Sequence, residues 1–279
     1  MPLELIWITN NPEIALIAQQ SGVQRIMVDM ETLGKEERQK NMNSVKSHHT
    51  VEDAAAIAKV LTTSKLLVRI NPWHENSVKE IEAVIAAGTD SIMLPMWKSA
   101  EEVDSFLRAV NKRVRTTLLL ETKEAEACLN AVLEHPLLDD IHIGLNDLHL
   151  SYGMDFMFEL YPEGVVDRIC QKCKAKGISY GIGGIARLGQ GLVPSEFVIM
   201  EHYRLGSSGA ILSRAFCNLA EIQDLDVIRQ LFAEEVGKIR EYESTLPSKT
   251  VEEFAANREI ANRYIREAAT VIRAKREKL

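Results

Sequence analysis

The sequence has few cysteines, no dense run of basic residues and no long apolar run, and each absence excludes a class of protein. Four cysteines in 279 residues are too sparse for a disulfide-stapled scaffold. The net charge is −7, and lysine and arginine form no dense run before the extreme C-terminus, which argues against a general nucleic-acid or anionic-membrane binder. No apolar run approaches the roughly 18 residues that suggest a membrane span, and no signal-peptide pattern opens the chain, so we expect a cytoplasmic protein.

The composition is that of an ordinary soluble globular protein. Hydrophobic residues make up 46% and charged residues 26% of the chain, enough for a sizeable core in one large domain or two small ones. Cys170 and Cys173 form a C-x-x-C pair, but the pair lies inside an expected helix, and no second Cys or His pair completes a zinc site. We therefore interpret the cysteines as structural.

Short apolar runs with many β-branched residues recur along the chain and predict eight strands. The predicted strands are residues 3–9, 25–31, 66–71, 91–96, 116–121, 141–146, 179–185 and 209–213. Helical patterns lie between them, at 50–61, 77–87, 100–110, 125–133, 164–176 and 195–205. Gly88, Gly177 and Gly206 each follow a helix and precede a strand, as left-handed helix caps do.

This alternation predicts an α/β fold of the (β/α)₈ TIM-barrel type, with additional C-terminal helices. Strands separated by helices pair in parallel through right-handed crossovers, and eight of them in about 215 residues match such a barrel in number and length. A doubly wound sheet is the alternative, because periodicity alone does not show that the sheet closes. We predict a barrel domain over 1–218 and a helical extension over 219–279.

The extension divides near Leu246-Pro247-Ser248. Its second part carries apolar residues at near-helical spacing on an otherwise charged helix. These residues include Phe254, Ile260, Tyr264, Ala268 and Ile272. We expect this stripe to pack across a subunit interface of a homo-oligomer, and packing on its own barrel is the alternative.

Two of the apolar runs end on acidic residues. Glu121 closes Thr-Thr-Leu-Leu-Leu-Glu, and Asp147 closes Ile-His-Ile-Gly-Leu-Asn-Asp. Each alone is as well explained as a cap of the following helix, but Arg69 closes a third run, Leu-Leu-Val-Arg. Because parallel α/β folds keep their chemistry at the carboxyl ends of the strands, the three residues predict a divalent metal beside an anion-binding arginine.

Five blocks of sequence carry a resemblance to a known family. They are Val-Asp-Met-Glu, Leu-Val-Arg-Ile-Asn-Pro, Gly-Thr-Asp-Ser-Ile-Met-Leu-Pro-Met, Leu-Leu-Glu-Thr and Ile-Gly-Leu-Asn-Asp-Leu. In order and spacing they resemble the HpcH/HpaI aldolase and citrate lyase β-subunit family over roughly residues 20 to 215. No single block is specific to that family, but the ordered set is.

The resemblance implies that Glu121 and Asp147 hold Mg²⁺ or Mn²⁺ and that Arg69 contacts the carboxylate and enolate oxygens of pyruvate. The chemistry is reasonable in itself, because a 2-oxo acid can chelate a metal that then stabilises its enolate, and Arg69 adds a fixed positive charge. Glu31, and less directly Asp29, would support Arg69 or a metal-bound water.

The sequence also departs from the pattern of that family. Thr32 follows Glu31 where sugar-acid aldolases of the family carry a histidine, and Leu119 stands where they carry a glutamine. The general base is therefore open. His48 and His49 could serve, since histidine titrates near neutral pH, and exposed loop histidines are the alternative.

A glycine-rich segment ends the seventh predicted strand. Gly183 and Gly184 would let backbone N–H groups approach an anion near Arg187, because barrels often bind phosphate around strands seven and eight. The alternative is a turn whose glycines only clear space. A lone G-x-G-x-x-A match in this segment is a weak dinucleotide signal, because no helix follows it directly.

Three functions differ in kind. The first is a metal-dependent lyase (aldolase) that joins or cleaves a 2-oxo acid such as pyruvate and an aldehyde. The second is a phosphoenolpyruvate-handling or acyl-CoA-ester-cleaving lyase on the same barrel, and the third is a non-catalytic homologue that binds metal and ligand. The expected partners are small molecules and further copies of the chain, a trimer or hexamer by family resemblance, with no nucleic acid and no membrane.

Overall fold

The computed structural model describes residues 1–34 and 49–276, and its eight parallel strands close into a barrel in the order β1 to β8. The strands are β1 (Glu4–Ile8), β2 (Arg25–Asp29), β3 (Lys65–Arg69), β4 (Ser91–Leu94), β5 (Arg115–Leu120), β6 (Asp140–Ile143), β7 (Ser179–Ile185) and β8 (Gly209–Leu212). The pairing of β8 with β1 closes the sheet, so the TIM barrel is confirmed and the doubly wound alternative is excluded.

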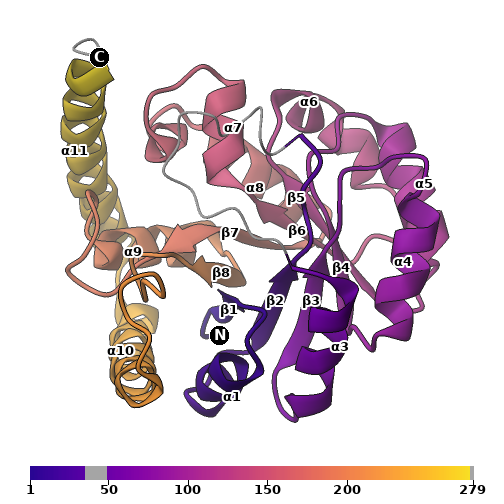
Figure 1. The fold of residues 1–279 in the computed structure, drawn as a ribbon. Coiled ribbons are helices and arrows are strands. Elements are labelled where there is room, and N and C mark those ends of the chain that lie inside the picture. The colour runs from indigo at the N-terminus through magenta and orange to yellow at the C-terminus, as the bar shows by residue number, and fades with distance from the viewer. Residues whose placement is uncertain (35–48, 277–279) are drawn as a thin grey trace.

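Helices surround the barrel (Figure 1). They are α1 (Pro12–Gln20), α3 (Val51–Val60), α4 (Ser77–Ala86), α5 (Ala100–Val110), α6 (Lys123–Val132), α7 (Leu145–Ser151), α8 (Val165–Ala175), α9 (Ser195–Leu205), α10 (Leu225–Thr245) and α11 (Val251–Arg276), with 3₁₀ turns η1 (Met157–Leu160) and η2 (Leu246–Ser248). Thr50 and Asp53 form a capping box at the start of α3. Gly88, Gly177 and Gly206 all have left-handed backbones, as predicted.

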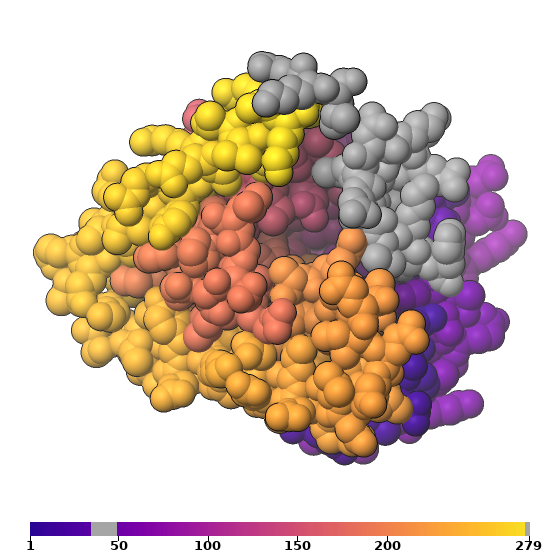
Figure 2. All heavy atoms as spheres, turned by 60° about the vertical axis from the view of Figure 1, so that its left-hand side comes forward, coloured from indigo at the N-terminus to yellow at the C-terminus, as the bar shows by residue number. Residues whose placement is uncertain are grey.

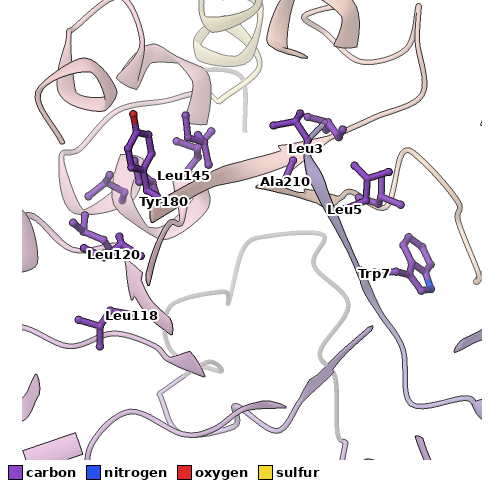
Figure 3. Packing of buried hydrophobic residues seen from close by; sticks show 14 of the residues in the cluster. Leu3, Leu5, Trp7, Leu118, Leu120, Leu145, Tyr180 and Ala210 are labelled. Carbon is purple, nitrogen blue, oxygen red and sulfur yellow. The ribbon is translucent and has the colours of Figure 1, made fainter. Parts of the chain in front are cut away.

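Alternate strand residues separate the two faces of the barrel wall. Leu5 and Trp7 of β1, with Leu3 just before it, belong to the main core between strands and helices, part of which Figure 3 shows. The intervening Ile6 points inward, where it joins a smaller apolar cluster. That cluster also contains Met27, Leu67, Met93 and Leu119. We call these five residues the apolar plate, because charged residues flank it along the strands on both sides.

The two C-terminal helices have different neighbours. Helix α10 packs against α1, and its Phe232 meets Trp7 edge-on with ring centroids 5.1 Å apart, so α10 shares the barrel core. Helix α11 packs on α9 and η1 (Figures 1 and 2). The predicted break falls at η2.

The predicted apolar stripe is covered within the chain. Ala268 of the stripe is buried, and three other members are partly buried against the core, namely Phe254, Tyr264 and Ile272. The ring centroids of Tyr264 and of Phe197 in α9 are 5.4 Å apart. Packing on its own barrel thus accounts for much of the stripe, and a subunit interface stays a prediction. Burial raises the pKa of the Cys173 thiol to about 12 and that of Cys170 further. Among the described residues, no helix is long and apolar enough to cross a membrane.

Candidate active site

The predicted site residues lie two positions beyond members of the apolar plate. Asp29 follows Met27 and Arg69 follows Leu67 at this spacing, and Glu121 follows Leu119. Because residues i and i+2 of a strand share a face, the three side chains point into the barrel just above the plate. They therefore meet at the carboxyl ends of the strands, where barrel enzymes keep their chemistry.

Arg69 is held by two acidic side chains. Its Nε and Nη2 donate to the two oxygens of Asp29, each at 2.8 Å, and its Nη1 lies 3.5 Å from Glu31 Oε2. Burial opposes the charged form, but the negative charge and hydrogen bonds of Asp29, with the charges of Glu31 and Glu121, raise the pKa of Arg69. Such a bidentate pair fixes the plane of the guanidinium. The predicted supporting role of Asp29 and Glu31 toward Arg69 agrees with these contacts.

Glu121 directly follows β5 and is only 3% exposed. Burial, together with the negative charges of Asp147 and Glu31, raises its pKa well above the ordinary value, while Arg69 and a hydrogen bond from the backbone N–H of Met96 act in the opposite direction. The charges of four carboxylates therefore act on Arg69 or on one another at this site, those of Asp29, Glu31, Glu121 and Asp147.

Asp147 does not end a strand, contrary to the prediction from its apolar run. Strand β6 stops at Ile143, Gly144 caps the next helix, and Asp147 lies in the first turn of α7. The helix can begin inside the apolar run because Leu145 and Leu148 are buried on its inner face. The charge of Asp147 still acts on Glu121, so the predicted pairing of the two carboxylates survives the change of element.

The donor set suits a hard divalent cation. Asp29 bonds to Arg69, and the charges of Glu31 and Asp147 both act on Glu121. Oxygen donors select Mg²⁺ or Mn²⁺ over softer metals, and Mg²⁺ commonly takes one or two carboxylates and completes its shell with water and substrate. Within residues 1–34 and 49–276, no three His, Cys, Asp or Glu side chains are arranged as a ready-made ligand cluster. Glu121 and Asp147 would therefore need water and substrate oxygens beside them.

The two candidate histidines have different outcomes. His48 lies outside the described residues. His49 Nδ1 accepts the backbone N–H of Asp29 at 3.0 Å, so the neutral ring carries its proton on Nε2. While this bond holds, Nδ1 cannot take a proton from a substrate, and Nε2–H is a donor.

Comparison with known proteins adds the family. The profile described as HpcH/HpaI aldolase/citrate lyase matches residues 5–183. The chain belongs to this family. No curated protein matches it as a relative.

Solved structures of the HpcH/HpaI family share its fold. An HpcH/HpaI aldolase from Desulfitobacterium hafniense DCB-2 is 14% identical with a TM-score of 0.64, over 82% of this chain and 93% of that chain. A HpcH/HpaI aldolase/citrate lyase family protein from Burkholderia cenocepacia J2315 is 17% identical with a TM-score of 0.60, over 82% and 95%. The citrate synthase SbnG is 16% identical with a TM-score of 0.60, over 82% and 94%.

In this member of the HpcH/HpaI family, packing explains one predicted anion-binding glycine. A Cβ added at Gly183 would lie 2.7 Å from Leu145 Cγ, so the glycine makes room for the first residue of α7. Gly184 lies against Ser213, and Arg187 Nε donates weakly to the carbonyl of Ala215 at 3.4 Å. Anion binding by this loop stays a prediction, and the described contacts account for Gly183 without it.

Three residues at the site were not singled out from the sequence. The N–H of Met96 bonds to Glu121, Gly144 lies against the same carboxylate, and Asn71 Oδ1 accepts the N–H groups of Thr32 and Leu33. Asn71 thereby holds the chain that follows Glu31. The quoted blocks contained all three, but the sequence pattern marks neither a backbone donor nor a space-making glycine.

Proposed function

We propose that this protein is a divalent-metal-dependent carbon–carbon lyase, an aldolase that acts on a 2-oxo acid such as pyruvate with an aldehyde as co-substrate. One observation carries the proposal. The guanidinium of Arg69, fixed by Asp29, stands beside the buried carboxylate of Glu121, on which the charge of Asp147 also acts. This arrangement offers one place for a cation and, next to it, one for an anion. Membership of a family of aldolases and citrate lyases supports the reaction class.

Glu121 and Asp147 would hold Mg²⁺ or Mn²⁺, which when bound supplies a Lewis acid for the keto oxygen of the substrate. Arg69 supplies the fixed positive charge. Its two bonds to Asp29 use two of the five N–H donors of a guanidinium, which leaves donors for the substrate carboxylate or the developing enolate oxygen. Because Arg69 cannot rotate while Asp29 holds it, this charge needs no reorganisation during the reaction.

His49 then acts as a donor rather than as the base. With Nδ1 bonded to the Asp29 N–H, the Nε2 of the neutral ring carries the proton and is a donor, not a base. This role also keeps Asp29 in place, since the same residue grips Arg69 through its side chain. We further propose that the protein works as a homo-oligomer.

The proposal is tested by exchange of the pyruvate methyl protons with deuterated water, followed by NMR with Mn²⁺, with Mg²⁺ and with EDTA. We expect exchange that requires metal, that Glu121→Gln abolishes and that Glu4→Gln preserves. Glu4 is the matched control, because it is a glutamate of β1 that pairs with Arg25 at the other end of the barrel. A folded native protein that shows no exchange with either metal, or full exchange in EDTA, would contradict the proposal.

If exchange occurs, addition of aldehydes of graded length and charge should give aldol products. If it does not, phosphoenolpyruvate and acyl-CoA esters are the next substrates to assay. Within the described residues, no contact of Gly183, Gly184 or Arg187 favours those substrates over pyruvate.

A further inference from the structure

The backbone of Met96 adopts a conformation that costs free energy. Its φ is 54°, in the left-handed region, where a residue other than glycine is strained. Asn111 and Lys112 are the other non-glycine residues with positive φ in the described chain, and they lie in the turn between α5 and β5, before the strand rather than after it. Met96 is thus the strained residue beside the candidate site.

The strained backbone aims a hydrogen-bond donor at Glu121. The Met96 N–H reaches Glu121 Oε1 at 3.0 Å, and the carbonyl of the next residue, Trp97, accepts from Thr122 Oγ1 at 3.0 Å. These two bonds tie the loop after β4 to the end of β5. Glu121 is buried, and its charge is repelled by neighbouring carboxylates. Without the Met96 donor, other orientations of its side chain therefore become more favourable.

Gly144 lies on the other side of the same carboxylate. A Cβ at this position would lie 3.0 Å from both Oε2 and Cβ of Glu121, and 3.0 Å from Leu119 Cδ1. The backbone of Gly144 has φ −86° and ψ 94°, which other residues also adopt. Glycine is therefore needed here for space and not for conformation.

We infer that Met96 and Gly144 are positioning residues that preset Glu121 as a metal ligand. Met96 holds one carboxylate oxygen by its backbone, and Gly144 leaves room for the other. The free-energy cost of the strained Met96 backbone is offset because the Glu121 carboxylate is already oriented when the cation binds. This inference rests on the proposed metal dependence and names two residues that touch neither metal nor substrate.

The test is Mn²⁺ affinity without substrate, measured by titration with electron paramagnetic resonance. Met96→Gly and Met96→Val both remove the thioether side chain, but glycine accepts a left-handed backbone and a β-branched residue resists it. We expect Met96→Gly to bind Mn²⁺ within about threefold of the native protein and Met96→Val to bind about tenfold more weakly, the lower end of the losses known for supporting residues.

Lys112→Val is the matched control for strain, since φ at Lys112 is 58°. It should lose stability much as Met96→Val does, yet keep native Mn²⁺ affinity. Equal affinity of Met96→Gly and Met96→Val, or an equal loss in Lys112→Val, would overturn the inference. A native protein that binds no Mn²⁺ would overturn the proposed function itself and the inference with it.

Gly144→Ala gives an independent test that does not depend on backbone strain. We expect Mn²⁺ affinity to fall about tenfold while the melting temperature changes little. Because the added methyl would also meet Leu119, the double variant Gly144→Ala/Leu119→Val should stay weak. Recovery of affinity in the double variant would assign the effect to Leu119 and contradict the role given to Glu121.

Discussion

The two ends of the barrel interior contain the same residue types in opposite balance. At the carboxyl end of the strands, Arg69 faces Asp29, Glu31, Glu121 and the nearby Asp147. At the amino end, Arg25 and Arg115 both bond to Asp140 Oδ2, at 3.4 and 2.8 Å, and Arg25 also pairs with Glu4 at 2.8 Å. Two guanidinium groups therefore converge on one carboxylate at the amino end, whereas carboxylates converge on one guanidinium at the carboxyl end.

A large cavity and the proposed active site lie at opposite ends of the barrel. A cavity of about 500 Å³ opens at the amino end and is lined by Arg25, Arg115 and Asp140, with His142 beside them. The buried Glu121, whose pKa is raised by burial and by neighbouring carboxylates, lies instead at the carboxyl end. Ion pairs at the amino end of a barrel are typical of stability, and groups with shifted pKa values at the carboxyl end are typical of function. The proposed site thus lies at the end where carboxylates gather around Arg69, and not beside this cavity.

The largest expected effect comes from replacing the arginine at the carboxyl end rather than one at the amino end. Arg69→Lys keeps one positive charge but loses the bidentate grip of Asp29, so we expect metal-dependent pyruvate exchange to slow by about 10³-fold. Arg25→Lys at the amino end should change the exchange rate by less than about threefold. NMR exchange rates at saturating Mn²⁺ measure both. A loss of similar size in the two variants would remove the functional distinction between the ends.

The second effect concerns stability in EDTA. Asp140→Asn removes the carboxylate that two guanidinium groups share, and breaking such a buried pair costs about 3 kcal/mol of the free energy of unfolding. Glu121→Gln removes a repelled carboxylate, so it should leave the metal-free protein as stable as the native one or more so. Urea unfolding monitored by circular dichroism gives both values. A destabilised Glu121→Gln would mean that favourable contacts of the Glu121 carboxylate outweigh this repulsion.

The third effect is a dependence of folding stability on pH, caused by the buried His142. Burial, with the charges of Arg25 and Arg69, lowers the pKa of His142 from 6.5 to about 3. The unfolded chain therefore binds a proton that the folded chain does not, and the stability present above pH 6.5 is lost as pH falls toward 3. Between pH 7 and 5 this histidine should cost about 2 kcal/mol. His142→Gln should reduce the slope of the urea midpoint against pH in that range, and His202, whose pKa burial also lowers to about 3, should keep the rest. An unchanged slope would show that the proton goes elsewhere.

The smallest effect comes from an arginine–aspartate pair on the outer surface. Arg276 Nη1 pairs with Asp155 at 2.9 Å, but its side chain is 66% exposed. Water screens such a pair, so Arg276→Ala should leave both the melting temperature and the Mn²⁺ affinity unchanged. A clear drop in melting temperature, seen by differential scanning calorimetry, would indicate that the end of α11 contributes more to stability than this contact shows.

The sequence predicted the strands well and their ends less well. All eight strands were predicted, but some predicted runs were longer than the hydrogen-bonded strands. Glu31 and Glu121 were therefore included in strands that end at Asp29 and Leu120. The overshoot has a physical cause. Residues that leave the last ladder bond can still point into the barrel, and they keep the apolar neighbours that suggested a strand.

Three charged members of the site were predictable because each lies two residues beyond an apolar residue of the plate, namely Asp29, Arg69 and Glu121. The hydrogen bond from Met96 was not, because nothing in its residue type indicates a left-handed backbone. The place of Asp147 in α7 depended on the burial of Leu145, which only the packing against Gly183 explains. Long-range contacts of this kind decide element boundaries that local patterns leave open.

The apolar plate gives the barrel a partition with an evolutionary consequence. The plate lies between the ion pairs of the amino end and the carboxylates of the carboxyl end. Its members are Ile6, Met27, Leu67, Met93 and Leu119. Mutations on the reactive side can then accumulate without disturbing the pairs that hold the opposite rim. Such a division separates tolerance of substitution at one end from stability at the other, on a fold that solved structures of 14 and 17% identity also have.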